Sequence, residues 1–354
     1  MKINAKIVVC FNSPVSIYSL YTGKENNDTN AVVEDLSEKS FAQEIDIIVS
    51  SLKNYFSRVE VLPIDRNINI TFNKLNVLSP DIIFNFVESV EGISSFESYN
   101  AGVYELMDIP YTGNRPQTLA NCLNKAFTKH ILKAFDIKTP SYIICKDDND
   151  LSNQNFNLNF PVIIKLLKED ASIGISENSV VNNFEELKKQ TDFLFKHFNQ
   201  EIIIEEFIEG REFNAAVLGD KVLPISEIKF DGLPEGLPKI VTYEGKWVAD
   251  TVYYKNTVPS CPAIIPEQQK KILEETALNA FNALECRDYA RVDIRLTKDN
   301  IPYVIEVNPN PDISTDSGFS RAASAAGLSY PELLFTIASF ALKRGDHDSQ
   351  NKAV

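Results

Sequence analysis

The segment from Ala290 to Asn310 gathers polar side chains of the kinds that bind metal ions and anions. It reads ARVDIRLTKDNIPYVIEVNPN, which predicts two strands joined by the turn TKDN. Side chains alternate across a strand, so Arg291 and Asp293 share a face, as do Glu306 and Asn308. The turn has an even number of residues, so both polar pairs are expected on the same side. The residues expected to face the core are Val292, Ile294, Ile305 and Val307.

Two carboxylates and an amide on one face suit Mg²⁺, which proteins hold with one or two carboxylates plus substrate phosphates. A solvated, salt-bridged hairpin face is the alternative interpretation. Two features favour the metal site over it. Glu306 lies inside an apolar strand, and Asn308 is followed by the rigid turn PNP.

Two lysines and an acidic strand end are further candidates. Lys165 ends the apolar run PVII, so a buried functional cation and a structural one are equally supported. Lys125 lies in a predicted helix over Thr118–Phe135, and taken alone it is expected to face solvent. The strand EIIIEEF (Glu201–Phe207) ends in acids, which by themselves do not demand a nucleotide.

Composition limits the class of protein. The chain has 354 residues, which at about 150 residues per domain suggests two or three domains. Acids outnumber bases 49 to 35, a balance that disfavours a general surface for nucleic acid or anionic membrane. No apolar run reaches the roughly 18 residues of a membrane span, and the apolar run near the N-terminus is too short for a signal peptide.

The cysteines and histidines exclude several other classes of site. Five widely spaced cysteines without a CxxC pair argue against a zinc ribbon or a disulfide framework. The three histidines are widely spaced in the sequence, which argues against the common metal sites built from imidazole ligands. Free thiols are typical of a reducing compartment, so we expect a cytoplasmic protein.

The pattern of apolar residues predicts an α/β protein. Strands are predicted over Lys6–Phe11, Val59–Ile64 and Asp81–Phe86, with a helical stretch from Ala31 to Phe56. Such alternation is typical of a parallel sheet covered by helices, with ligands at the carboxyl ends of its strands. The later elements predicted are a strand SYIIC, a strand Pro161–Leu167, a helix Asn183–Phe198, a long loop Asp231–Ala263, a helix Pro266–Leu284, two C-terminal helices with a capping box at Ser329 and Glu332, and a frayed polar tail.

In order and spacing these motifs resemble the ATP-grasp superfamily, and within it the D-alanine–D-alanine ligase-like carboxylate–amine ligases. EEFIEGREF followed by ARVD and EVNPN is the most specific part, and the similarity runs over most of the chain. The resemblance implies a three-domain ATP-grasp fold: an N-terminal α/β domain over 1–115, a central subdomain over 116–207, a C-terminal catalytic subdomain over 208–345, and a tail over 346–354. ATP would lie between the last two domains.

The resemblance also implies residue roles. Lys125 and Lys165 match lysines that contact ATP, Glu205 and the backbone around Ile208 match the adenine hinge, and Glu212 matches the ribose-binding acid. Asp293, Glu306 and Asn308 match the magnesium ligands; two Mg²⁺ ions are expected, with Mn²⁺ as an alternative. Arg291 matches the oxyanion arginine. Lys246 and Ser317 match positions that hold the carboxylate of the acceptor amino acid.

The departures from the family pattern concern the donor site. The loop after the first strand reads FNSPVSIYS and lacks the glycines and the donor-binding glutamate. Ala171 stands where a loop serine is usual, Trp247 where a tyrosine is usual, and Asp312 where a glycine is usual. We therefore expect a donor other than plain D-alanine.

The expected function is ATP-dependent amide bond formation through an acylphosphate, with an amino-acid acceptor. The alternatives are a non-catalytic ATP-binding homologue, a true D-alanine–D-alanine ligase, or a biotin-carboxylase-like activation. Expected partners are small carboxylates and amines, with no nucleic acid and no membrane. The family resemblance also implies a homodimer.

Overall fold

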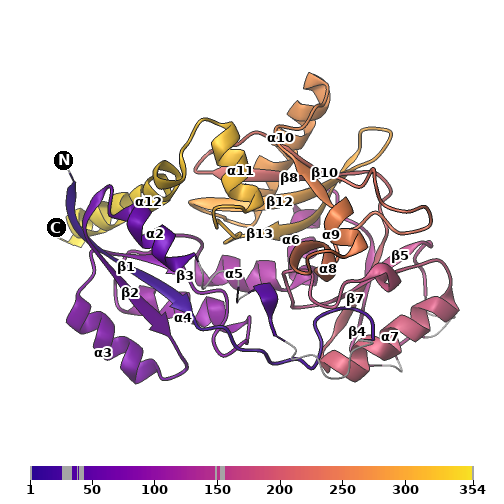
Figure 1. Cartoon of the computed structure of the whole chain (residues 1–354), viewed down its shortest axis with the longest axis horizontal. Helices are drawn as coiled ribbons and strands as arrows, with labels where there is room; N and C mark the ends of the chain where they lie inside the picture. The colour runs from indigo at the N-terminus through magenta and orange to yellow at the C-terminus, as the bar shows by residue number, and fades with distance from the viewer. Residues whose placement is uncertain are drawn as a thin grey trace.

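The computed structural model describes residues 2–25, 34–37, 39, 44–147, 150–151 and 156–352, with side chains through residue 345. The chain forms three sheets, and both termini lie at the same end of the molecule (Figure 1). The mixed α/β architecture predicted from the sequence is confirmed.

The N-terminal part is a three-stranded parallel sheet in the order β2-β1-β3. Its strands are β1 (Ile3–Asn12), β2 (Phe56–Ile64) and β3 (Ile82–Phe86), and its helices are α2 (Ile45–Leu52), α3 (Ile68–Leu78) and α4 (Phe96–Leu106). All five residues of β3 are buried, as expected for a parallel strand covered on both faces. The parallel sheet predicted from the sequence is confirmed.

The helix predicted over Ala31–Phe56 is wrong in its described C-terminal part. The structure ends α2 at Leu52, and Phe56 opens β2 with its side chain fully buried. Residues 26–33, 38 and 40–43 of the predicted stretch lie outside the described residues. Burial of Phe56 in the sheet core outweighed the helical period that the sequence suggested.

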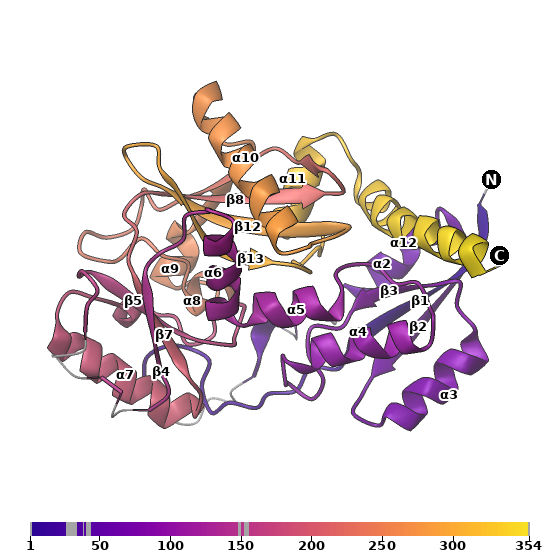
Figure 2. The same cartoon turned by 180° about the vertical axis from the view of Figure 1, so that it is seen from behind.

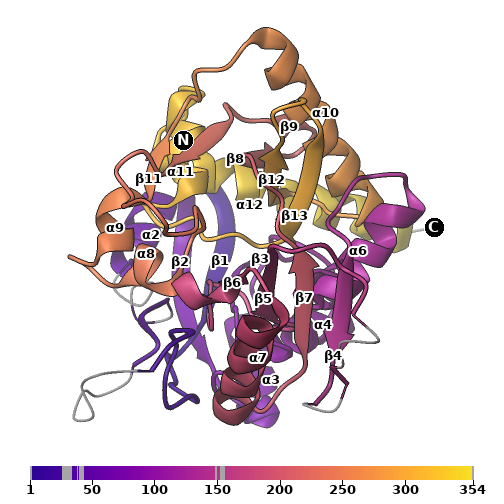
Figure 3. The same cartoon turned by 90° about the vertical axis from the view of Figure 1, so that its right-hand side faces the viewer.

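The central part is an antiparallel sheet in the order β4-β7-β5-β6. It comprises β4 (Tyr142–Cys145), β5 (Val162–Leu166), β6 (Val180–Val181) and β7 (Ile202–Glu206). Helix α7 (Phe184–Phe198) covers one face of the sheet, and Leu187 and Leu194 pack in the same core as β5 and β7 (Figure 3).

The helix predicted over Thr118–Phe135 is two helices, α5 (Pro116–Leu123) and α6 (Lys125–Ala134). Asn124 separates them with an extended backbone (φ −85°, ψ 100°), and its side chain accepts hydrogen bonds from the N–H groups of Ala126 and Phe127. An asparagine that caps a new helix in this way ends the preceding one. Figure 2 shows α5 and α6 at an angle, near the place where the three sheets meet.

The C-terminal part is a six-stranded antiparallel sheet in the order β11-β10-β8-β12-β13, with β9 paired to β8. Its strands are β8 (Arg211–Leu218), β9 (Lys221–Val222), β10 (Ser226–Lys229), β11 (Val258–Ser260), β12 (Tyr289–Leu296) and β13 (Pro302–Asn308). Helix α10 (Glu267–Ala283) packs against this sheet through Leu273 and Ala277.

Two predictions for this part are corrected. The long loop predicted over Asp231–Ala263 contains the short helices α8 (Tyr243–Trp247) and α9 (Val252–Asn256), as well as β11. The tail predicted to fray is helical through Lys352, because α12 (Tyr330–Lys352) continues past residue 345. At the start of α12 the Glu332 carboxylate accepts a hydrogen bond from Ser329 N–H at 2.8 Å, as the predicted capping box requires.

The core joins the first and last parts of the chain. Helices α11 (Gly318–Ala325) and α12 pack with β1, β3 and α2 in one cluster that includes Ile7, Phe84, Phe319 and Ile337. Figures 1 and 2 show α12 lying beside the N-terminal sheet. No single helix among the described residues is long and apolar enough to cross a membrane; α11 with residues 330–345 passes such a test only as a pair, bent by 101°.

Candidate active site

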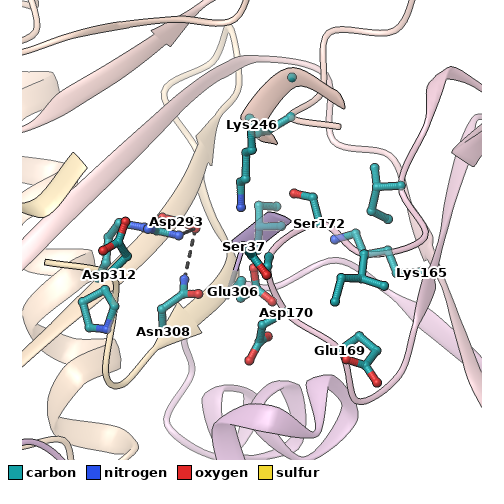
Figure 4. A pocket seen from close by; sticks show the side chains of 18 of the residues that line it. Ser37, Lys165, Glu169, Asp170, Ser172, Lys246, Asp293, Glu306, Asn308 and Asp312 are labelled. Atoms are coloured by element: carbon teal, nitrogen blue, oxygen red, sulfur yellow. Dashed lines mark hydrogen bonds and ion pairs between the residues drawn. The ribbon is translucent and has the colours of Figure 1, made fainter. Parts of the chain in front are cut away.

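One cavity of about 700 Å³ lies between the three parts of the molecule, and every site residue predicted from the sequence lines it. Figure 4 shows side chains from both β-hairpin strands, the loop after β5 and α8 converging on this space. The predicted residues that line the cavity are Lys125, Lys165, Glu205, Ile208, Glu212, Lys246, Arg291, Asp293, Glu306, Asn308 and Ser317.

The hairpin of β12 and β13 places its polar residues as predicted. Arg291 pairs with Asn308, and Asp293 pairs with Glu306, in an antiparallel register. The Asp293 carboxylate accepts two hydrogen bonds from Arg291, at 2.8 and 2.9 Å, and one from Asn214 at 2.7 Å. Asn308 donates its amide to the same carboxylate at 3.1 Å (Figure 4).

The predicted core side of the hairpin is wrong at one position. A β-bulge follows the Asp293–Glu306 pair, so that Ile294 pairs with Val304 and Ile305 is the extra residue. Val304 is fully buried instead, and Ile305 lines the cavity beside Glu306. Sequence alternation alone carries no sign of a bulge, which re-aims a side chain by inserting one residue.

The donor set fits a hard cation. Among the described residues no three His, Cys, Asp or Glu side chains come close enough to hold a metal ion. Asp293 and Glu306 supply two carboxylates on one face of the hairpin. Asn308 gives its N–H to Asp293, so its carbonyl oxygen is the atom it can offer a metal. Two carboxylates and an amide oxygen, completed by phosphate and water, are suited to Mg²⁺.

Lys125 is buried, which corrects the solvent-facing position expected for it alone. The break at Asn124 makes it the first residue of α6. Its ammonium lies 3.1 Å from Glu306 and 3.4 Å from Asp170, and it also donates to the Glu169 carbonyl. Burial alone would lower the pKa of Lys125, but Glu306 and Asp170 outweigh it and the pKa is raised. Lys125 therefore stays charged.

Lys165 and Glu205 form a buried ion pair across β5 and β7, with 3.1 Å between Nζ and Oε2. The other carboxylate oxygen of Glu205 lies 3.1 Å from Nζ of Lys129, which the sequence analysis did not identify. Burial lowers the pKa of Lys129 to about 8, although Glu205 opposes the shift. The spacing of the two lysines could have identified Lys129, because it follows Lys125 by four residues and therefore lies on the same face of the helix.

Arg295 is the second residue that the sequence analysis missed. It donates to Glu212 Oε2 at 2.7 Å and to the Ile208 carbonyl at 3.1 Å, and it lies over the Phe207 ring at 4.7 Å. Because it follows Asp293 by two residues, strand alternation puts it on the polar face of β12. It holds the predicted ribose acid and the predicted hinge together.

Lys246 and Ser317 provide groups that favour an anion. Lys246 makes no ion pair among the described residues, and its side chain points into the cavity (Figure 4). Burial, and then the charge of Arg291, lowers the pKa of Lys246. Ser317 caps α11, accepting a hydrogen bond from Ser320 N–H at 3.1 Å, so it stands at a helix N-terminus. A carboxylate is favoured there.

The loop after β5 is held in an unusual conformation. Ala171 and Ser172 have positive φ angles of 54° and 62°. The Trp247 indole donates to the Ala171 carbonyl at 3.0 Å and links the loop to α8. Consecutive non-glycine residues in the left-handed region persist only when their surroundings enforce them, and such residues cluster at ligand-binding loops.

The segment after β1 crosses this loop. We call residues 17–24 the strap. The Tyr21 carbonyl accepts a backbone bond from Gly174 at 2.8 Å, and Tyr18 donates to Glu169 at 2.5 Å. Lys24 pairs with Glu177 and Glu244, at 3.1 and 2.8 Å. The strap therefore fastens the loop after β5 to α8.

Acidic side chains outside residues 13–17 reach the end of the cavity that is formed by the N-terminal part. Asp35, Glu88 and Glu97 line the cavity, and Glu97 accepts a hydrogen bond from Asn310 at 2.9 Å. Burial, and then the charge of Glu88, raises the pKa of Glu97 well above its usual range. Acidic side chains therefore lie at this end although the loop glutamate is missing, and the neutral form of the buried Glu97 is favoured.

Comparison with known proteins places the chain in a family. Residues 131–339 match the family model described as the D-ala D-ala ligase C-terminus. The chain is 34% identical over 311 residues to D-alanine–D-alanine ligase of Carboxydothermus hydrogenoformans, covering 84% of this chain and 92% of that protein. It is 32% identical over 266 residues to an uncharacterized protein, y4sG, of Sinorhizobium fredii, covering 74% and 75%.

The fold agrees with solved structures. The Bacillus anthracis D-alanine–D-alanine ligase complexed with ATP superposes with a TM-score of 0.74 at 22% identity, over 98% of this chain and all of that one. The VanG D-Ala:D-Ser ligase of Enterococcus faecalis superposes with a TM-score of 0.65 at 21% identity, over 96% of this chain and all of that one. The chain belongs to the D-alanine–D-alanine ligase family of ATP-grasp ligases.

Proposed function

We propose that the protein is an ATP- and Mg²⁺-dependent carboxylate–amine ligase that forms an amide bond through an acylphosphate. One observation carries the proposal: Arg291, the Asp293–Glu306–Asn308 face, Lys246 and the lysines Lys125 and Lys165 line a single cavity. Such a cavity can take a polyphosphate, a metal ion and a second anion together.

Different residues of the chain serve different steps of the proposed reaction. Lys125 and Lys165 offset the charge of the ATP phosphates while the donor carboxylate attacks the γ-phosphate. Asp293, Glu306 and Asn308 would hold Mg²⁺, which supplies charge neutralisation at the phosphates. Lys246 and Ser317 hold the carboxylate of the acceptor amino acid, so that the amine of the same amino acid faces the acylphosphate. Arg291 stabilises the oxyanion that forms when the amine attacks.

A non-catalytic ATP-binding homologue is the first alternative. It has no use for an oxyanion arginine, yet Arg291 is present and is clamped to Asp293 by two hydrogen bonds. A biotin-carboxylase-like activation is the second alternative. It has no use for a cation and a helix N-terminus set to bind an acceptor carboxylate, which favours the ligase.

We also propose a donor other than plain D-alanine. The loop residues 13–17 contain no acid, and Trp247 and Ala171 meet directly through a hydrogen bond near the same end. Acidic side chains come instead from Glu88, which follows β3, and from Glu97, which lies in the first turn of α4 and whose raised pKa favours its neutral form. A donor whose positive charge is displaced from the D-alanine position suits this arrangement. A true D-alanine–D-alanine ligase is the competing function, and it is favoured by the names of the curated relatives.

Kinetics with defined substrates tests both proposals. The protein is supplied with ATP, Mg²⁺ and either D-alanine alone or pairs of carboxylic acids and amino acids, and phosphate and amide product are measured. Phosphate release that requires an acid–amino-acid pair supports the ligase. Turnover with D-alanine alone at about 1 per second or faster, the low end of typical enzyme rates, would overturn the donor proposal. No amide product with any pair would contradict the ligase.

We further expect a homodimer that works in the cytoplasm on small-molecule carboxylates and amines, with Mn²⁺ able to replace Mg²⁺. Light scattering of the purified chain measures the oligomeric state. Metal replacement in the kinetic assay measures the ion preference.

A further inference from the structure

Lys129 lies behind the cavity wall rather than in it. Its side chain is 1% exposed, and among the described residues Lys129 does not line the cavity. Three oxygens surround its ammonium: Glu205 Oε1 at 3.1 Å, Thr139 Oγ1 at 3.1 Å and the Ile305 carbonyl at 3.2 Å. Lys129 donates hydrogen bonds to Thr139 and Ile305 and forms an ion pair with Glu205, so its ammonium is engaged by protein oxygens on the side away from the cavity.

Two of these partners belong to different sheets, and both line the cavity. Glu205 is on β7 of the central sheet, where Lys165 holds its other oxygen at 3.1 Å. Ile305 is the bulge residue of β13 in the C-terminal sheet and directly precedes Glu306. Lys129 therefore ties the wall of the predicted adenine site to the strand that carries the predicted metal ligand.

The neighbouring backbone strengthens this tie. The Lys138 carbonyl accepts a hydrogen bond from Val304 N–H at 2.8 Å, so the segment after α6 runs beside the bulge of β13. Thr139 is buried in that segment. Because a bulge leaves one residue outside the ladder, the carbonyl of Ile305 needs another partner, and Lys129 provides it.

We propose that Lys129 is a positioning residue, which sets the distance between the nucleotide-base end and the metal end of the site by fixing Glu205 and the Ile305–Glu306 bulge to each other. It acts through these residues and does not touch ATP. This role presupposes the proposed ATP binding. Its loss is expected to act on ATP and Mg²⁺ and to spare the amino-acid substrate, whose proposed site at Lys246 and Ser317 lies on α8 and at the start of α11.

The test compares K129M with wild type and with K133M. Lys133 is on the same helix one turn later, is exposed, and lies over the Tyr142 ring, so K133M controls for loss of a lysine from α6. ATP affinity in Mg²⁺ is measured by calorimetry, and KM values for ATP and for the amino-acid acceptor are measured separately. K129M is expected to lower kcat/KM for ATP about 10- to 100-fold, the range found for residues that orient ligand groups, with the acceptor KM unchanged.

A double-mutant cycle separates positioning from general stabilisation. If Lys129 acts through Glu205, K129M should weaken ATP binding much less in an E205Q background than in wild type. Equal losses in both backgrounds, or an unchanged ATP affinity in folded K129M, would overturn the inference. If K129M does not fold, T139V is the decisive variant. It removes the Thr139 oxygen that Lys129 contacts and keeps the charge of Lys129. Unchanged ATP affinity in T139V would then overturn the inference. Absence of ATP binding in wild type would instead contradict the proposed function.

Discussion

Single side chains at the hairpin carry the sharpest prediction. Asp293→Asn and Glu306→Gln keep size and delete the charge that a divalent ion needs. A bound metal supplies several kcal/mol of charge stabilisation, so turnover is expected to fall below about 1% of wild type. Phosphate release is measured at saturating ATP, with circular dichroism to check the fold. Glu209→Gln, an exposed acid of the same region, is the matched control. Near-wild-type turnover in either variant would remove the metal assignment.

Arg291 should matter for product formation more than for nucleotide binding. In Arg291→Ala the Asp293 carboxylate keeps its hydrogen bonds from Asn214 and Asn308, so the metal face is retained. Removing one oxyanion donor lowers the rate about 100-fold or more. Product formation and ATP affinity are measured in parallel. An equal loss in both would place Arg291 in the phosphate site instead.

The lowered pKa of Lys246 predicts a pH dependence. An ordinary lysine stays charged to about pH 10.4, whereas burial and Arg291 make Lys246 lose its proton at lower pH. Only the charged form binds a carboxylate, so the acceptor KM should be constant at low pH and rise as pH passes through the lowered pKa. Lys246→Arg should shift this rise upward, because arginine does not deprotonate in this range. The same profile in both proteins would show that another group titrates.

The helices and strands show how much of the fold could be predicted from the sequence. Strands β3, β5 and β7 were predicted within one or two residues, because each is a short, mainly apolar run. Strands β12 and β13 were predicted equally well, because their polar and apolar residues alternate on either side of a four-residue turn. The positions that were missed depend on contacts between distant segments. Asn124 ends α5 where Lys125 must reach Glu306 and Asp170, 181 and 45 residues away in the chain. The carbonyl of the bulge residue Ile305 accepts a hydrogen bond from Lys129, which lies 176 residues away.

The site residues also differ in whether they could be predicted from the sequence. Alternation along β12 and β13 was sufficient to place Arg291, Asp293, Glu306 and Asn308 on one face. Lys129 and Arg295 look like ordinary helix and strand cations until the burial of their carboxylate partners is known. Their roles depend on which distant acid they meet, which one sequence does not specify.

At the strap, a glycine makes close backbone approach possible. A Cβ on Gly23 would lie 2.2 Å from the Gly174 carbonyl oxygen, so Gly23→Ala must push the strap off the loop after β5. The Gly23 carbonyl would then lose its hydrogen bonds from Ser176 and Gln190, both 2.9 Å. We expect a higher KM for ATP and faster proteolysis of this loop. Gly102→Ala, whose Cβ would meet only Pro116 at 3.9 Å, is the control. Unchanged loop protection in Gly23→Ala would show that the strap does not hold the loop.

The whole molecule is arranged so that its first and last parts act as one body. The core shared by β1, β3, α11 and α12 is apolar and continuous. A polar clamp lies beside it: the Asp288 carboxylate is paired with Arg344 and accepts a hydrogen bond from Gly113 N–H at 2.9 Å. Arg344 also donates to the Tyr111 carbonyl at 2.7 Å. The turn that ends the N-terminal part is thus fastened to the C-terminal sheet.

This clamp predicts how the molecule unfolds. The Asp288 side chain is only 2% exposed, so Arg344→Met leaves a buried carboxylate with Gly113 N–H as its main remaining partner. Breaking a buried pair by removing one partner costs about 3–5 kcal/mol, and the lower end applies because Arg344 is partly exposed. Urea unfolding of Arg344→Met should show a loss of about 3 kcal/mol in one transition, because the shared core keeps both parts cooperative. Adding Asp288→Asn to this variant should recover part of the loss by deleting the unpaired charge. Two separate transitions, or no loss in the single variant, would show that the first and last parts are stabilised independently of the clamp.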